Sequence, residues 1–125
     1  MLLNLTRDQI ADALIGGSTY TKYNNANAYI AVGDSTTAEA AGQTDLQAST
    51  NKLRKAMDST YPQRSGNVLT FRATFGTSDA NFAWNEWAIA NASSSGQILN
   101  RKVQNVGTKG SSSTWQATAT ITIGV

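Results

Sequence analysis

The fold is decided by the stretch at 115–123, which reads Trp115-Gln116-Ala117-Thr118-Ala119-Thr120-Ile121-Thr122-Ile123. Apolar side chains occupy every odd position, and threonine or glutamine occupies every even position. Successive side chains of a β-strand point to opposite faces of the sheet, so this alternation indicates one buried and one solvated face. Threonine on the outer face favours strand geometry and stays hydrated. We predict a strand over 114–123.

The same alternation appears at 68–75, where VLTFRATF places an apolar residue at every odd position. Segments rich in Pro, Gly, Ser and Asn separate further apolar stretches and indicate turns between strands. The remaining predicted strands lie at 27–33, 52–61, 82–91 and 97–103. Six strands joined by short turns predict an all-β fold, either an antiparallel β-sandwich or a jelly-roll-like barrel, in a single β-rich domain over 1–125.

One short helix is predicted at about 7–15. Thr6 with Gln9 three residues later matches a capping box, and Asp8 adds negative charge to the first turn. Gly16 and Gly17 then end the helix. An apolar stripe at i, i+3 and i+4 is formed by Ile10, Ala13 and Leu14. So short a helix is not stable alone, so we expect this stripe to pack against the rest of the domain.

Two segments depart from the simple strand pattern. Residues 34–51 show no clean period, and a loop of this length usually covers or binds something. The strand at 82–91 carries apolar residues on both faces, with Phe82, Trp84, Ala88 and Ala90 on one and Trp87 and Ile89 on the other. Either this is a central strand between the sheet and the helix, or one tryptophan lies in a subunit interface.

The composition excludes most catalytic chemistry. The 125 residues include no histidine and no cysteine, which removes the usual general base, the commonest metal ligands and thiol nucleophiles. The net charge is +2, and Thr, Ser, Asn and Gln make up 46 residues, so polarity comes mainly from uncharged groups. The apolar runs are too short to span a membrane, and no leader pattern opens the chain. We expect a soluble protein without an export signal.

Glu86 is the one carboxylate in an aromatic setting, between Trp84 and Trp87. Such a group could act as an acid or bind sugar, but a glycosidase needs two carboxylates across a cleft. The alternative is a structural glutamate paired with a strand arginine such as Arg54 or Arg72. Because histidine and cysteine are missing and the carboxylates are scattered along the chain, we predict no enzyme activity and no catalytic residues.

Other polar groups give weak indications of a site. Asp34, Glu39 and Asp45 flank the long loop but lack the spacing of a calcium loop, so we expect no metal and no cofactor. The densest basic cluster is formed by Lys52, Arg54 and Lys55, with the first two on one strand face. Without interleaved aromatic residues this cluster indicates a solvated edge or a contact with an acidic partner rather than nucleic-acid binding. The segment 107–110 lacks a phosphate-loop frame and is interpreted as a turn.

Several segments together resemble small tailed-phage virion proteins. The order YIAVGDSTT at 29–37, then TDL at 44–46 and a basic strand, is similar to their V/I-G-x-G/S-T-T strand end followed by T-x-L and an arginine-bearing strand. LTFRATF at 69–75, NEWAI at 85–89, ILNR at 98–101, Lys109 and the closing strand continue the likeness, over roughly 26–123. The chain departs at Ala88, where relatives often carry glycine, and the N-terminal helix has no clear counterpart.

The resemblance implies a virion structural protein, most simply a capsid decoration (cement) protein on the outer capsid surface, assembled in the host cytoplasm. Its expected partner is the major capsid protein, with self-association, a trimer by analogy, and no nucleic acid or membrane. The 82–91 strand is the candidate oligomer surface, and the 34–51 loop or the N-terminal segment the candidate shell contact. The alternatives are a tail-fibre or collar component, or a carbohydrate-binding module using Trp84, Trp87 or Trp115.

Overall fold

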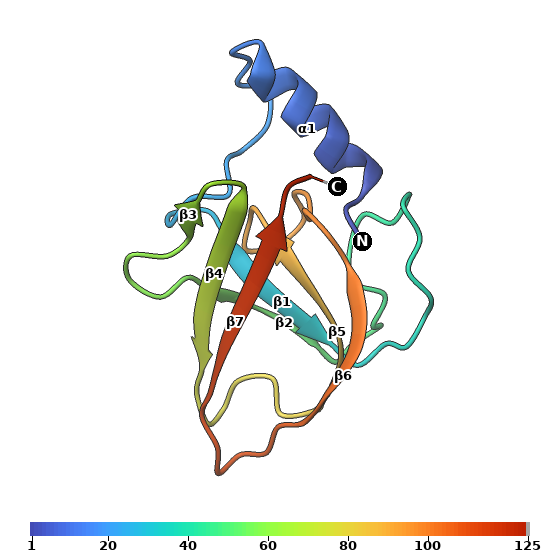
Figure 1. Ribbon diagram of the computed structural model, residues 1–125. Helices are drawn as coiled ribbons and strands as arrows, with labels where there is room; N and C mark the ends of the chain where they lie inside the picture. The colour runs from blue at the N-terminus through green and yellow to red at the C-terminus, as the bar shows by residue number, and fades with distance from the viewer. Residues whose placement is uncertain (125) are drawn as a thin grey trace.

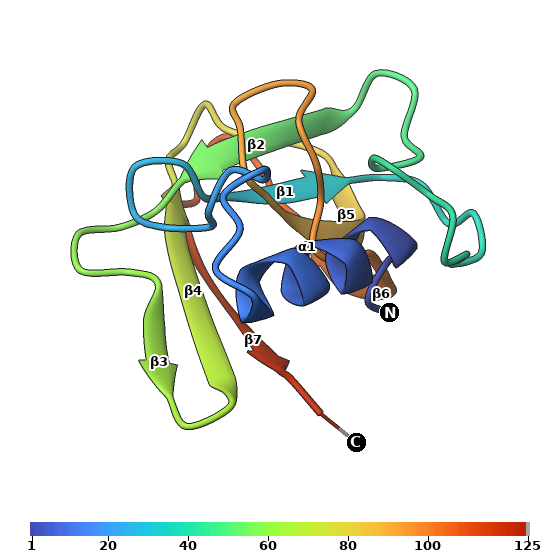
Figure 2. The same cartoon turned by 90° about the horizontal axis from the view of Figure 1, so that it is seen from above.

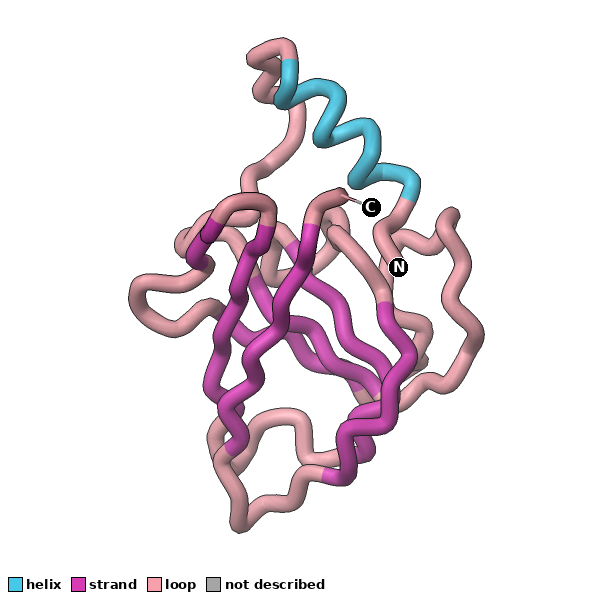
Figure 3. The backbone as a smooth tube through the Cα atoms, viewed as in Figure 1, coloured by secondary structure: helices cyan, strands magenta, loops and turns pink. Residues whose placement is uncertain are grey.

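A computed structural model describes residues 1–124 as two antiparallel sheets packed face to face, with one helix at an end (Figure 1). The elements are α1 (Asn4–Leu14), β1 (Tyr29–Gly33), β2 (Lys52–Ala56), β3 (Gln63–Ser65), β4 (Val68–Phe75), β5 (Ala83–Ala90), β6 (Lys102–Thr108) and β7 (Trp115–Thr122). One sheet has the order β2-β1-β5-β6 and the other β3-β4-β7. Figure 3 shows how strands dominate the body of the molecule. The predicted all-β sandwich is therefore confirmed.

The two alternating stretches pair with each other in the smaller sheet, with β4 in its middle and β7 at its edge. β4 pairs with β7 along its whole length, from Val68 opposite Thr122 to Phe75 opposite Trp115. Their odd-numbered side chains face the other sheet, and Phe71, Ala73 and Phe75 are fully buried there. The buried face is therefore the one that the period-two pattern predicted.

The core between the sheets is built from these residues and from β1 and β5. Ile30 and Val32 of β1 and Ile89 of β5 belong to the same buried cluster as Phe71. Three aromatic rings stack edge to face across the sheets: Phe75 contacts Trp84 at 4.7 Å between centroids, and Trp84 contacts Trp115 at 4.9 Å. Such edge-to-face contacts add to the stabilisation from burial.

An irregularity in the pairing of β5 with β6 accompanies the apparent lack of a polar face in β5. Between Trp84 and Glu86 the register shifts, because β6 advances four residues, from Gly107 to Val103, for two residues of β5. Even-numbered side chains of β5 on opposite sides of this shift lie on different faces. Trp84 therefore shares the inner face with Trp87 and Ile89, whereas Ala88 packs in a second cluster on the outer face. The prediction that Trp84 lies on the face of Ala88 was wrong.

β5 is a central strand, as one of the two readings required. Its inner face meets the second sheet, and its outer face is covered by the long loop and the start of the chain rather than by the body of the helix. Leu3 and Leu46 fill this outer cluster with the β5 alanines. Because both faces of β5 are covered over most of its length, the strand as a whole is not available as an oligomer surface, although Trp87 stays half-buried.

Three predicted boundaries were wrong for identifiable reasons. The strand predicted at 52–61 ends at Ala56, and Thr60 adopts a left-handed φ of 71° that no strand accommodates. The segment read as a turn after Pro62 contains the short strand β3 before turning at Gly66. The strand predicted at 97–103 is instead β6 at 102–108.

The irregular segment before β6 pairs with two different neighbours. Asn100 inserts its side-chain oxygen where a backbone acceptor would lie, and accepts the backbone N–H of Ile89 at 3.0 Å. Leu99 donates to the Ile89 carbonyl, and Arg101 donates to Met1 at 3.0 Å. A side chain thus interrupts the ladder, so regular pairing resumes only at Lys102.

The helix starts earlier than predicted and its cap differs. Leu3 is the N-cap and makes no side-chain cap, so the capping-box prediction at Thr6 was wrong. Thr6 is buried, and its hydroxyl donates to the Leu99 carbonyl at 2.5 Å. The predicted stop is confirmed, since Gly16 has a φ of 80° directly after the C-cap Ile15.

The predicted packing of the helix stripe holds only at its start. Seen from above, α1 lies across one end of the sandwich and the 34–51 loop projects beside it (Figure 2). Ile10 is half-buried, but Ala13 is exposed and Leu14 is 80 % exposed, and Ile15, beyond the stripe, is 88 % exposed. Within residues 1–124 no helix combines the length and apolar character needed to cross a bilayer.

Candidate functional site

The buried pair of Glu86 and Arg101 lies at the base of the long loop. Both side chains are inaccessible to solvent, and the Arg101 Nε donates to Glu86 Oε1 at 2.8 Å. The loop supplies further partners, because the backbone N–H groups of Gln47 and Ala48 both donate to the carboxylate at 2.8 Å. Every oxygen of Glu86 is therefore occupied by a structural hydrogen bond.

Arg101 ties down the other half of the same loop. Its Nη1 donates to the Thr37 carbonyl at 2.8 Å and to Gln43 Oε1 at 3.2 Å. The 34–51 segment thus covers the outer face of the larger sheet. Its first half is hydrogen-bonded to Arg101 and its second half to Glu86, so one ion pair holds both halves. This arrangement can hold a loop rigid, but it leaves Glu86 no contact with a substrate.

The structural reading of Glu86 predicted an arginine partner, and the structure places a different arginine there. Arg54 reaches Asp45 at 3.2 Å and Arg72 reaches Asp58 at 3.0 Å. Arg101 was missed because it follows the irregular segment at 97–100, where no strand period indicates a side-chain direction. Only its place in the chain, just before a strand next to β5, could have suggested the pairing.

The three loop carboxylates do not converge. Asp34 accepts from Asn51, Asp45 pairs with Lys52 and Arg54, and Glu39 accepts the backbone N–H of Val103 at 2.8 Å. Within residues 1–124 no group of three acidic side chains is placed to hold a metal ion.

The basic cluster on β2 is neutralised inside the chain. Lys52 and Arg54 share one face and meet Asp45, while Lys55 points the other way and meets Asp79 at 2.7 Å. The predicted division of the three cations between two faces is confirmed. Since each has an acidic partner, β2 presents little free positive charge.

Lys109, in the segment 107–110 interpreted as a turn, is buried and links two connections of the fold. Its Nζ donates to the Gly76 carbonyl at 2.6 Å and to Asn81 Oδ1 at 2.8 Å. These bonds join the β6–β7 connection to the β4–β5 turn. The turn itself begins after Thr108, because Gly107 and Thr108 still belong to β6. Two of the three ammonium donors are used in these internal bonds, and burial of the side chain keeps the group from a phosphate in solution.

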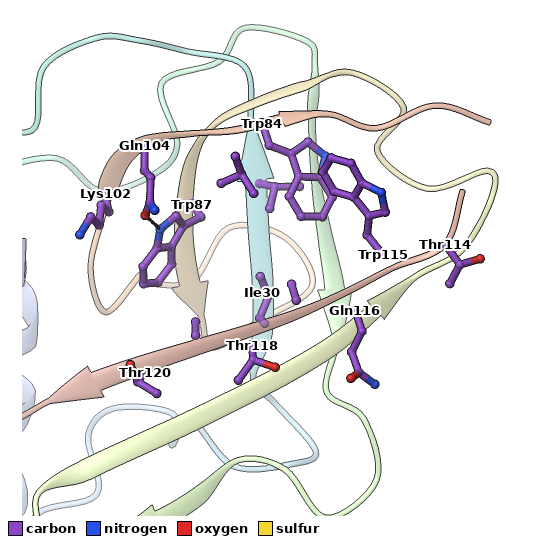
Figure 4. Close-up of a pocket in the computed structure, with 14 residues that line it drawn as sticks. Ile30, Trp84, Trp87, Lys102, Gln104, Thr114, Trp115, Gln116, Thr118 and Thr120 are labelled. Atoms are coloured by element: carbon purple, nitrogen blue, oxygen red, sulfur yellow. Dashed lines mark hydrogen bonds between the residues drawn. The ribbon is translucent and has the colours of Figure 1, made fainter. Parts of the chain in front are cut away.

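A large hollow in the described part of the chain lies between β6 and β7, and we call it the β6–β7 groove (Figure 4). It forms because β6 and β7 are edge strands of different sheets and do not pair with each other. The inward side chains of β6 are consequently exposed in an opening of about 660 Å³. Its lining includes Lys102, Gln104, Val106, Trp87, Ala117 and Ala119.

The tryptophans are distributed unequally around this groove. Trp84 is only 4 % exposed and forms part of the floor, so it offers no platform. Trp87 and Trp115 are half-buried in the walls, and the Trp87 indole N–H donates to Gln104 Oε1 at 3.3 Å. Sequence reasoning singled out these aromatics but missed the groove. Which strands lie at the edges of the two sheets, and so border the groove, is decided only by the tertiary structure.

Comparisons with known protein families, with curated proteins and with solved structures found no match to this chain.

Proposed function

We propose that this protein is a non-enzymatic structural subunit of a tailed-phage particle, a capsid decoration protein that packs on the major capsid shell and stabilises it. One observation carries the proposal: the charged groups best placed for chemistry are engaged in internal bonds, while the exposed surface is mostly uncharged. Glu86, Arg101 and Lys109 are all buried and partnered. The resemblance in the sequence supplies the phage particle.

The outer surfaces suit close contact with another protein. The even-numbered residues of β7 are exposed and consist of glutamine and threonine. The exposed part of the long loop at 36–44 carries mainly Thr, Ala, Gly and Gln. Such surfaces form hydrogen bonds with a neighbour without long-range charge repulsion.

The 34–51 loop is the favoured contact with the shell. Its exposed residues extend from the body, and the buried Glu86–Arg101 pair holds its base. A loop held in one conformation loses little conformational entropy on binding, which favours affinity. Copies that associate with one another, with a trimer as the number taken from the resemblance, attach more firmly through several such loops.

Reconstitution on shells assembled without the protein tests this function. We expect saturable binding to the outer surface, followed by a higher melting temperature of the shells. Ala38→Arg in the exposed loop should weaken binding about tenfold or more, since it forces a charge into the contact. Ser112→Arg in the exposed connection between β6 and β7, outside both the loop and the β6–β7 groove, is the matched control and should bind normally. Failure of the wild-type protein to bind shells would contradict the proposal, and density confined to the tail would favour a tail-fibre or collar component instead.

Catalytic inactivity is part of the proposal and has its own assay. We expect no turnover of peptidoglycan or polysaccharide, because the acidic groups are either dispersed or locked in ion pairs. Turnover that disappears in Glu86→Gln would show an enzyme.

A carbohydrate-binding module is the second candidate, favoured by the two half-buried tryptophans and the amides in the β6–β7 groove. Aromatic faces beside amide groups are suitable for sugar rings. Titration with bacterial surface glycans while tryptophan fluorescence is recorded would distinguish this candidate, and Trp87→Ala should abolish any saturable change.

A further inference from the structure

Exposed apolar side chains are few and gather at two places. The large ones in residues 1–124 are Met1, Leu14, Ile15 and Val106. Leu14 and Ile15 together form the helix tip, which stands clear of the sandwich at the end of α1 (Figure 1). Val106 is 51 % exposed and lines the β6–β7 groove. The chain therefore carries a projecting apolar group and an apolar hollow, each without an internal partner.

The tip of α1 is held away from its own groove. The start of the helix is fixed to the body, since Thr6 bonds Leu99 and the Asn4 N–H donates to Ala41 at 2.9 Å. From there the helix runs outward, away from the opening between β6 and β7 (Figure 1). A second copy is thus the molecule that brings such a tip to this groove.

The groove and the helix also complement one another in charge. Lys102, Gln104 and Val106 are alternate residues of β6 and all line the groove. Lys102 and the exposed Asp8 of α1 make no ion pair within residues 1–124. The groove therefore offers an unpaired cation at one end and an apolar side chain at the other.

The spacing of these groups matches along the two elements. Asp8 and Ile15 are seven residues apart, about two turns, so they lie on one side of the helix roughly 10 Å apart. Lys102 and Val106 are four residues apart in β6, at most about 13 Å, because the register irregularity falls between Val103 and Gly107. A helix laid along β6 with Ile15 at Val106 therefore brings Asp8 close to Lys102.

We propose that the helix tip of one copy docks in the β6–β7 groove of a second copy, with Ile15 against Val106 and Asp8 near Lys102. The inference rests on the proposed function, for which it names the self-association surface in place of β5. Because the tip and the groove are different surfaces, the contact is head-to-tail. Such a contact forms a ring, a trimer among them, when its rotation closes.

Sedimentation velocity on the full chain tests the docking with variants at exposed positions. Leu14→Ser with Ile15→Ser removes the tip, and Val106→Lys blocks the groove. Each should weaken self-association about tenfold or more, as expected when a central contact is lost. Asn105→Lys adds the same charge to the same strand outside the groove and should associate like the wild type.

Mixing the two defective variants gives the sharper result. The tip variant keeps its groove and the groove variant keeps its tip, so together they should form a 1:1 complex that grows no further. Asp8→Lys and Lys102→Asp should each weaken association, and the double variant should regain it. The proposal is overturned if the two variants form no complex on mixing. It is also overturned if only the tip variant loses association while Val106→Lys associates normally, because helices would then pack on each other.

Shell binding separates this inference from the proposed function. A wild-type chain that stays monomeric at 100 micromolar (roughly the upper range used for weak contacts) but binds shells overturns the docking and leaves the function standing. A chain that assembles through tip and groove but binds no shell supports the docking and contradicts the function.

Discussion

Gly33 is the residue where the buried ion pair and the long loop leave no space. It ends β1 directly opposite Glu86, and a Cβ at this position would overlap the Glu86 carboxylate and approach the Ala48 side chain. The need for glycine here is therefore steric and does not depend on a left-handed backbone.

We expect Gly33→Ala to lower the free energy of unfolding by about 1–3 kcal/mol, because the added methyl group displaces a carboxylate that cannot move without losing Arg101. Urea denaturation followed by circular dichroism measures the effect. Gly42→Ala in the same loop is the control, since nothing lies within 4 Å of its added Cβ. Equal midpoints for the two variants would mean that the carboxylate has room to shift.

Asp79 gives a prediction about acid stability. Hydrogen bonds from the Lys55 ammonium at 2.7 Å and from the Gly76 N–H at 2.8 Å lower its pKa below the ordinary value of 3.8. A carboxyl whose pKa is lowered by folding stabilises the fold above its unfolded pKa, and that contribution is lost as the pH falls through the folded value.

Asp79→Asn should therefore reduce the dependence of stability on pH below 3.8 and leave the slope above it unchanged. Denaturation midpoints measured across a pH series compare the variant with the wild type. If the midpoints of the variant and the wild type fall equally as the pH is lowered, other carboxyls account for the loss of stability in acid.

At the scale of elements, the 34–51 loop depends on one ion pair. Four of its residues bond to Glu86 or Arg101, and no helix or strand lies within the loop. Its order therefore follows from two side chains that belong to β5 and to the residue before β6.

Glu86→Gln should destabilise the protein by about 3–5 kcal/mol, because it leaves the Arg101 charge buried without a counter-charge. Hydrogen exchange should rise across 34–51 before it rises in the strands. Asp8→Asn, at an exposed position with no ion pair, should remain within about 0.5 kcal/mol of the wild type. Unchanged exchange in the loop would mean that its apolar contacts alone hold it.

At the scale of the whole molecule, a single apolar cluster joins the two sheets. Phe71 and Phe75 enter it from the smaller sheet, and Ile30 and Trp84 enter it from the larger one. Because the Trp84–Trp115 contact spans both sheets, the aromatic circular-dichroism signal reports their packing while the far-ultraviolet signal reports the strands.

We expect the two signals to change in one coincident transition on denaturation, as for a single cooperative domain. Phe71→Ala should lower the free energy of unfolding by about 3–5 kcal/mol while the transitions stay coincident. Thr118→Ala on the exposed face of β7 should change it little. Loss of the aromatic signal ahead of the strand signal would show that the sheets separate before they unfold.

The sequence alone determined the strands whose neighbours are regular. Alternation over 68–75 and 115–123 predicted the strands β4 and β7 and their buried faces, since side-chain direction in a strand depends only on its own period, whereas their pairing with each other came from the structure. The stop at Gly16 was equally local. The absence of histidine and cysteine limited the chemistry before any coordinates were considered.

Only the tertiary structure decided the rest, because the causes lie far apart in the chain. The register of β5 shifts against β6, Arg101 reaches Glu86 across 15 residues, and Thr6 bonds a carbonyl 93 residues away. The β6–β7 groove exists because these edge strands of the two sheets do not pair with each other. A local pattern contains no information on which strands form the edges of the sheets.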